Sequence, residues 1–172
     1  KFSVKNKNQK VMNDIIKEYQ LENKFVVTFL GRVAPEKSVD LLIEAMQDIY
    51  SKNHQICLMI VGGGPQLEEL QELTKELQLT HCVYFTGPKE ADLVPSYYHV
   101  SDLFVSASIT ETQGLTFIEA MASGIPALAR YDKNLEGVIL DGRNGFFFED
   151  KVDLTQKILE LAQTDLSQLS MH

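Results

Sequence analysis

The sequence contains no tryptophan, only 2 cysteines, no long apolar run and no excess of basic residues. Cys57 and Cys82 lie in or beside apolar stretches and form no CxxC pair. This argues against a disulfide framework or a cysteine metal site, and it favours a reducing, cytoplasmic environment. No apolar stretch approaches the roughly 20 residues that a membrane-spanning helix needs, and no signal peptide is recognisable.

The charge balance excludes a further class of partner. The 172 residues include 16 Lys and Arg against 24 Asp and Glu, which gives a formal net charge of -8. Nucleic-acid binding needs a basic surface, so we expect no nucleic-acid partner, although a local cationic pocket for a small anion is compatible with this balance. The 4 histidines share no spacing, and we therefore expect neither a metal site nor a catalytic histidine.

The size and composition fit one globular domain. The hydrophobic content of 44% and the charged content of 23% are ordinary for a folded protein, and 172 residues can bury one sizeable core. We expect residues 1–172 to form a single domain. The sequence begins with Lys1 and no initiator Met, so we also expect it to be a piece of a longer protein.

Short β-branched apolar runs alternate with stretches of helical period. The runs are 25–30, 56–61, 83–85, 103–105, 127–129 and 146–148. Helices are expected at about 9–20, 39–50, 65–77, 95–100, 115–123 and 152–163. Ser38 is the predicted N-cap of the second helix and Pro65 the predicted first residue of the third. This alternation predicts an α/β fold, a Rossmann-like doubly wound parallel sheet covered by helices.

In such a sheet, ligands bind beyond the carboxyl ends of the strands, so the loops after the strands are the candidate sites. The loop 31–38 follows the first strong strand and carries Arg32 and Lys37 directly before a helix. A guanidinium, an ammonium and a helix N-terminus together suit a phosphate. Two solvated surface cations beside a turn are an equally good explanation of this loop alone.

The second loop carries the glycines Gly62, Gly63 and Gly64. It differs from the dinucleotide fingerprint because Leu67 stands where the third glycine belongs and no acidic residue follows about 20 positions on. We therefore favour turn geometry over direct ligand contact. The stretch 141–145 is predicted to be a tight turn leading to the last strand.

The loop after the fourth strand carries two carboxylates, Glu111 and Glu119. Gly114 opens a helix between them, and the backbone N–H groups of about residues 114–116 can receive phosphate oxygens. Glu119 lies one turn further on and can point back to the same place. A carboxylate there can accept hydrogen bonds from a vicinal diol such as a ribose. Taken singly, both residues are equally well explained as ordinary loop and helix charges.

These residues resemble a known family. Glu111 and Glu119, with Gly114 between them, resemble the E-x7-E signature of family 4 retaining glycosyltransferases. Further stretches are similar to landmarks of that family in the expected order: 31–32, 36–37, 101–106, 120–126 and 141–146. The resemblance covers roughly residues 24–163. It implies a GT-B enzyme, of which this chain would be the C-terminal, donor-binding domain without the N-terminal acceptor domain.

The resemblance implies a role for each matching position. Arg32 and Lys37 would hold the diphosphate and stabilise it as it leaves. Glu119 would bind the ribose, and Glu111 would contact the transferred sugar near its reacting carbon. Further donor contacts would be made at Gly31, Gly114, Leu115 and Thr116, and near the nucleobase at Gly87 and Lys89. The departing charge would be met by these cations and a helix terminus, without a metal ion or a cofactor.

Two positions depart from the family pattern. Gln113 stands where many members have Phe, which leaves the sugar preference open, and Gly137 stands where a Glu often lies, so that contact is not carried over. The sequence around residues 111–116 is most similar to that of bacterial enzymes that transfer glucose from UDP-glucose to diacylglycerol or its monoglucosyl derivative. The expected partners are therefore a UDP-sugar, the N-terminal domain and a membrane lipid acceptor, with the full-length protein peripheral at the inner face of the membrane.

Two alternatives stay open at this point. One is a UDP-sugar epimerase or phosphorylase with the GT-B fold, which would act on the donor without an acceptor. The other is a non-catalytic α/β binding module, which would bind no nucleotide. We expect the isolated domain to bind its donor and to transfer little of it.

Overall fold

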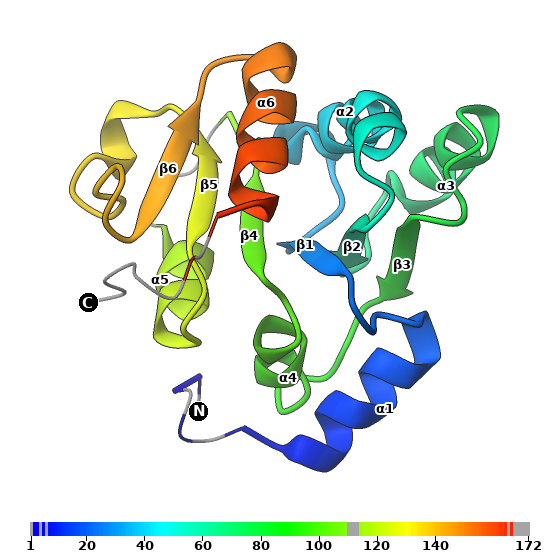
Figure 1. The fold of residues 1–172 in the computed structure, drawn as a ribbon, viewed down its shortest axis with the longest axis horizontal. Coiled ribbons are helices and arrows are strands. Elements are labelled where there is room, and N and C mark those ends of the chain that lie inside the picture. The colour runs from blue at the N-terminus through cyan, green and yellow to red at the C-terminus, as the bar shows by residue number, and fades with distance from the viewer. Residues whose placement is uncertain (1, 4, 6, 110–113, 165, 167–172) are drawn as a thin grey trace.

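The computed structural model describes residues 1–172 except 1, 4, 6, 110–113, 165 and 167–172. It contains a six-stranded sheet in the order β3-β2-β1-β4-β5-β6 (Figure 1). All neighbouring strands are parallel. The strands are β1 (Phe25–Leu30), β2 (Ile56–Val61), β3 (Val83–Gly87), β4 (Leu103–Ser106), β5 (Ala127–Arg130) and β6 (Gly145–Phe148). The predicted doubly wound parallel sheet is confirmed.

Helices cover both faces of this sheet. They are α1 (Gln9–Tyr19), α2 (Val39–Lys52), α3 (Leu67–Glu76), α4 (Val94–His99), α5 (Leu115–Ala122) and α6 (Lys151–Ala162), with short 3-10 turns η2 (Pro35–Lys37) and η3 (Lys133–Leu135). The buried side chains of α2, α3 and α6 share one core cluster, and those of α1, α4 and α5 belong to two clusters on the other face. Figure 1 shows these two groups of helices on opposite sides of the strands.

The four inner strands β1, β2, β4 and β5 are largely buried on both faces, which explains their nearly continuous apolar sequences. On β1, Val27 and Phe29 pack toward α2, whereas Val26 packs with α1 residues on the opposite face. The order of strands reverses beside β1, which pairs with β2 on one side and with β4 on the other. A crevice beyond the carboxyl ends of strands at such a reversal is the usual ligand position in this type of fold.

Of two local predictions about helix starts, the position of Ser38 is confirmed without the expected side-chain cap, and the position of Pro65 is wrong. Ser38 does occupy the N-cap of α2, but its φ is 49° and its side chain makes no capping hydrogen bond. Pro65 precedes α3, which begins at Leu67. The reason is tertiary: the Gln66 N–H donates to the carbonyl of Val33 at 3.1 Å, so residues 65–66 form a turn held by the neighbouring loop.

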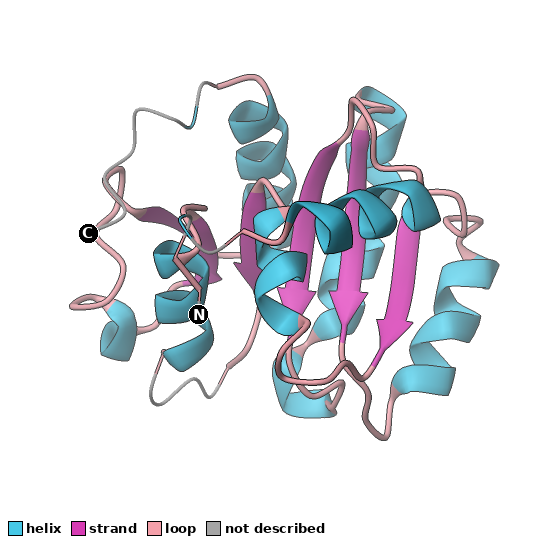
Figure 2. Cartoon of the chain, turned by 90° about the horizontal axis from the view of Figure 1, so that it is seen from below, coloured by secondary structure: helices cyan, strands magenta, loops and turns pink. Residues whose placement is uncertain are grey.

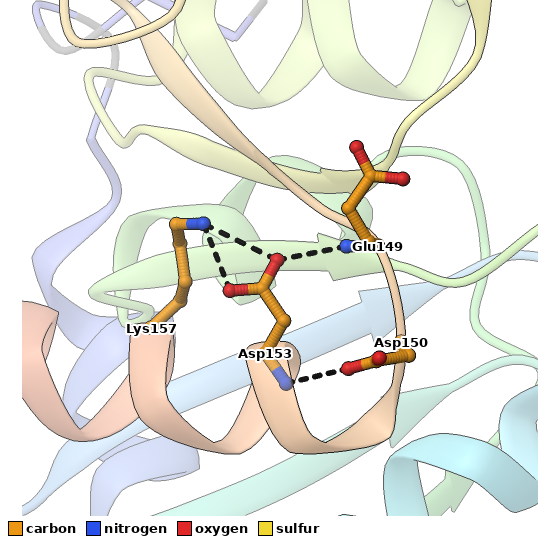
Figure 3. Close-up of polar contacts among 4 residues, drawn as sticks. All are labelled: Glu149, Asp150, Asp153 and Lys157. Carbon is orange, nitrogen blue, oxygen red and sulfur yellow. Dashed lines mark hydrogen bonds and ion pairs between the residues drawn. The ribbon is translucent and has the colours of Figure 1, made fainter.

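Two aspartate side chains cap the start of α6, one at the N-cap and one in the first turn (Figure 3). Asp150 accepts a hydrogen bond from the Asp153 N–H at 2.8 Å, and Asp153 accepts one from the Glu149 N–H at 2.8 Å. Lys157 lies 3.1 Å from the Asp153 carboxylate. Partial burial works in the opposite direction, but the Glu149 N–H and Lys157 lower the pKa of Asp153 overall. The cap therefore uses charged carboxylates at a helix N-terminus, where they are favoured.

No helix in the part of the chain that the structure describes is both long enough and apolar enough to cross a membrane. Cys57 and Cys82 are both buried free thiols. Burial raises the pKa of Cys57 to about 12 and that of Cys82 to about 11, so both thiols stay protonated and behave as small core side chains.

We expect Asp150→Ala to lower the free energy of unfolding by about 1 kcal/mol, because the Asp153 N–H loses its capping acceptor. Urea unfolding followed by circular dichroism measures the change. Glu160→Ala is the matched control, since Glu160 is an exposed carboxylate on the same helix and its loss should leave stability nearly unchanged. Equal unfolding free energies for Asp150→Ala and wild type would show that the cap contributes nothing.

Candidate functional site

The loops that follow β1, β2 and β3 are joined by backbone hydrogen bonds at the carboxyl edge of the sheet. The N–H of Val33 donates to the carbonyl of Gly63 at 2.9 Å, and the N–H of Gly62 donates to that of Gly87 at 3.1 Å. Figure 2 shows the strands ending at a common side, with these connecting loops beyond the arrowheads. The loop backbones therefore form one layer on which side chains from three strands are placed together.

Glycines allow these loops to approach so closely. A Cβ atom on Gly62 would collide with the carbonyl oxygen of Gly31, and one on Gly64 would collide with that of Val33. Gly62 also has a φ of 140°, which side chains rarely adopt. The predicted geometric role is confirmed for these two glycines, and Gly62 and Gly63 also line the cavity described next.

A cavity of about 240 Å³ lies between the three loops. Three of the predicted donor-binding residues line it: Gly31, Arg32 and Lys89. The Lys89 ammonium lies 6.0 Å from the ring centroid of Tyr97. Gly87 ends β3 directly before the lining residue Pro88.

Arg32 and Lys37 stand on the loop between β1 and α2. The Arg32 guanidinium pairs with the Glu36 carboxylate at 3.1 Å, and the two side chains are 64% and 40% exposed. An exposed pair of this kind contributes at most about 1 kcal/mol, so a phosphate can displace the carboxylate at small cost. Lys37 ends the turn η2 and is partly buried.

The same loop is attached to the loop that follows β4. The carbonyl of Glu36 accepts hydrogen bonds from the Ile109 N–H at 3.2 Å and from the Ser108 hydroxyl at 3.3 Å. This contact brings the Arg32 and Lys37 loop beside the residues that lead to α5. Glu111, for which we expect contact with the transferred sugar, lies outside the described residues.

The start of α5 has the backbone geometry that the sequence predicts. Gly114 occupies the N-cap with a φ of 61°, and the first bond of the helix runs from the Ile118 N–H to the Gly114 carbonyl at 3.0 Å. The N–H groups of Leu115 and Thr116 therefore have no acceptor within α5. Unpaired N–H groups at a helix start are in general able to bind a phosphate.

Glu119 lies one turn into α5 and is partly buried. Its Oε2 atom accepts a hydrogen bond from the Tyr98 hydroxyl at 3.4 Å, and the same hydroxyl lies 3.3 Å from the carbonyl oxygen of Thr116. Burial and the neighbouring Glu119 charge raise the pKa of Tyr98 strongly. Sequence reasoning missed Tyr98, because nothing in its spacing indicates that α4 would contact α5.

The predicted residues thus form two groups rather than one. Gly31, Arg32 and Lys89 line the cavity, whereas Gly114 precedes α5 and Glu119 lies on it. Helix α5 contributes no residue to the lining of this cavity. The Glu36 carbonyl connects the two groups.

The stretch 101–106, which resembles a landmark of the family, begins with a residue that has a structural role. Asp102 precedes β4 at the opposite, amino edge of the sheet, where its carboxylate accepts from the Val26 N–H at 2.7 Å. Burial raises the pKa of Asp102 despite this bond. Its position is that of a structural connection between β1 and β4, far from the cavity loops. Among the residues that the structure describes, no group of three or more His, Cys, Asp or Glu side chains could hold a metal ion.

The sheet order and the joined loops at its carboxyl edge define a Rossmann-like fold. A profile of the family "Glycosyl transferases group 1" matches residues 11–170, and the chain belongs to this family. An alpha-monoglucosyldiacylglycerol synthase of Acholeplasma laidlawii is 33% identical over 141 residues, which cover 82% of this chain and 35% of that protein. The predicted family membership is confirmed.

Solved structures show the same fold. The C-terminal domain of the glycosyl transferase group 1 protein LpcC from Francisella tularensis superposes with a TM-score of 0.80 at 24% identity, over 95% of this chain and 86% of that one. Anabaena HepE in complex with UDP and glucose gives a TM-score of 0.82 at 23% identity, over 95% of this chain and 46% of that one. The fold is therefore that of a C-terminal GT-B domain. The chain spans about a third of the length of the curated relatives it matches.

We expect Gly64→Ala to destabilise the domain by at least about 2 kcal/mol, because the new Cβ forces the two loops apart. Gly137→Ala is the matched control, since no atom lies within 4 Å of a Cβ built there. Urea unfolding of both variants measures the difference. A Gly64→Ala protein as stable as the control would mean that the loops separate without cost.

Proposed function

We propose that this chain binds the nucleotide-sugar donor of a retaining hexosyltransferase, and that the donor is UDP-glucose. The observation that carries the proposal is the attachment of the cationic loop to the loop before α5 through the Glu36 carbonyl. This attachment brings two cations and a helix N-terminus to one edge of the sheet. A diphosphate placed there meets donors on both sides.

The charge arrangement supports a role in catalysis as well as in binding. As the bond to the sugar breaks, negative charge grows on the departing diphosphate, and groups fixed in advance around it stabilise the transition state. Arg32, Lys37 and the N–H groups at Leu115 and Thr116 are the residues that we assign to this task. Arg32 would leave its weak pair with Glu36 for the phosphate.

We assign the other parts of the donor to residues that lie near the proposed diphosphate site. The nucleobase would occupy the cavity lined by Gly31 and Lys89, with Gly87 supporting its rim, and the ribose hydroxyls would bind Glu119. Glu111 would contact the transferred sugar. No metal ion or cofactor is required in this scheme, since the cations and the helix terminus supply the positive charge.

The acceptor is proposed from the relatives alone. The similarity to an alpha-monoglucosyldiacylglycerol synthase supports diacylglycerol or a glycolipid as acceptor. We assign the acceptor site to an N-terminal domain of the same protein, at the inner face of the membrane. The isolated domain is then a donor-binding unit with little or no transferase activity.

Ligand-observed NMR with a panel of UDP- and GDP-sugars tests the donor assignment. We expect saturation-transfer signals with UDP-glucose and a marked loss of signal for Glu119→Ala, because the ribose loses its acceptor. Glu76→Ala, an exposed carboxylate on α3, is the control and should bind as wild type does. Binding of no sugar nucleotide would refute the assignment and favour a non-catalytic module. Hydrolysis or epimerisation of the donor without an acceptor would favour the GT-B epimerase or phosphorylase instead.

The diphosphate site has its own test. Arg32→Ala and Lys37→Ala should each weaken UDP binding by roughly tenfold, the effect of losing one charge-assisted hydrogen bond. Isothermal titration calorimetry measures the affinities. Lys52→Ala removes an exposed cation at the far end of α2 and should leave them unchanged. If neither variant differs from this control, Arg32 and Lys37 do not bind the diphosphate.

A further inference from the structure

Among the residues that the structure describes, Tyr98 is the largest fully buried side chain, with none of its surface exposed to solvent. Its ring packs against Phe104 with centroids 5.8 Å apart, and the Phe2 ring meets it edge-on at 5.8 Å. Phe104 in turn packs edge-on against Phe117 of α5 at 5.3 Å. The ring therefore has little freedom to move, and the position of its hydroxyl is fixed by the core.

The core cluster around Tyr98 is otherwise apolar. Its other buried members are Phe, Leu, Ile, Met and Ala residues, among them Phe104 and Phe117. Burying a hydroxyl without a hydrogen bond costs more than burying the phenyl ring alone. A tyrosine is thus favoured over phenylalanine here only because of what the hydroxyl contacts.

The hydroxyl contacts two parts of α5. It lies 3.3 Å from the Thr116 carbonyl and 3.4 Å from Oε2 of Glu119. One hydroxyl proton serves both acceptors, so the group links the backbone of the first turn with the carboxylate one turn later. Because the carboxylate can accept about four hydrogen bonds, a bond from Tyr98 still leaves room for a ligand diol.

We propose that Tyr98 is a positioning residue, whose hydroxyl fixes the Glu119 carboxylate relative to the first turn of α5 so that it can receive the vicinal hydroxyls of a ribose. This inference rests on the proposed function. Tyr98 does not touch the donor itself. It acts from beneath α5, and its effect on binding passes through Glu119.

Tyr98→Phe removes one oxygen and keeps the ring. We expect UDP affinity to fall about tenfold, since the carboxylate loses a donor that helps to order it before the ligand binds. Affinity for 2′,3′-dideoxyuridine diphosphate, which lacks the diol, should not change. In the Glu119→Ala background, Tyr98→Phe should cause no further loss of UDP affinity, because the two residues act as one unit.

Tyr50→Phe is the matched control. Tyr50 is a partly buried tyrosine of α2, and it packs against a different core cluster. The control should bind both nucleotides as wild type does. Unchanged UDP affinity in Tyr98→Phe, or an equal loss for both nucleotides, would overturn the positioning role while leaving the proposed function intact. If wild type binds neither nucleotide, or binds both equally, the ribose site at Glu119 fails and this inference fails with it.

A second measurement needs no change at Tyr98 and applies even where Tyr98→Phe does not fold. In protein with 13C-labelled tyrosine, saturating UDP should shift the ring resonances of Tyr98 in wild type. The shift should disappear in Glu119→Ala at saturation. A Tyr98 shift that persists without the carboxylate, or that is absent in wild type, would overturn the coupling.

Discussion

The hydrogen bonds that the Glu36 carbonyl accepts from Ile109 and Ser108 are the constraint on which the candidate site depends. All six strands are parallel and end at the same edge, so the loops that follow them lie close together. Hydrogen bonds fix the loop after β1 against the loop after β4 at the point where the strand order reverses. This contact places the cationic segment beside the approach to α5, and the glycines of the neighbouring loop let the backbones pack closely enough to keep it there.

The sequence predicted the six strands and the helices well, because a strand buried on both faces must be apolar along its whole length and a surface helix must be apolar on one side. It did not predict the details at Ser38 and Pro65. Those turns are shaped by contacts with distant segments, such as the bond between Gln66 and Val33. Local propensity predicts how a helix starts when only neighbouring residues of the chain matter. At Ser38 and Pro65, contacts with other loops determine the geometry.

For the candidate site, the sequence predicts Arg32, Gly114 and Glu119, because ligands bind beyond strand ends and because their spacing resembles a family signature. Their roles in donor binding stay predictions. Tyr98 could not be found in this way, since its contact with Glu119 joins two helices that only the fold brings together. The departure at Gly137 lies on an open surface, with no atom within 4 Å of a Cβ built there, so the domain tolerates a missing side chain at that position.

Glu36 participates in the site through two chemically separate parts. Its backbone carbonyl joins the loops, while its carboxylate holds the Arg32 guanidinium. Every residue type carries a backbone carbonyl, so a substitution at this position keeps the acceptor, whereas only an acidic side chain can form an ion pair with the arginine. The availability of the guanidinium is therefore adjustable by the side chain at position 36 alone. A substitution of Glu36 can therefore change the affinity of the site for an anion and leave the contact between the loops in place.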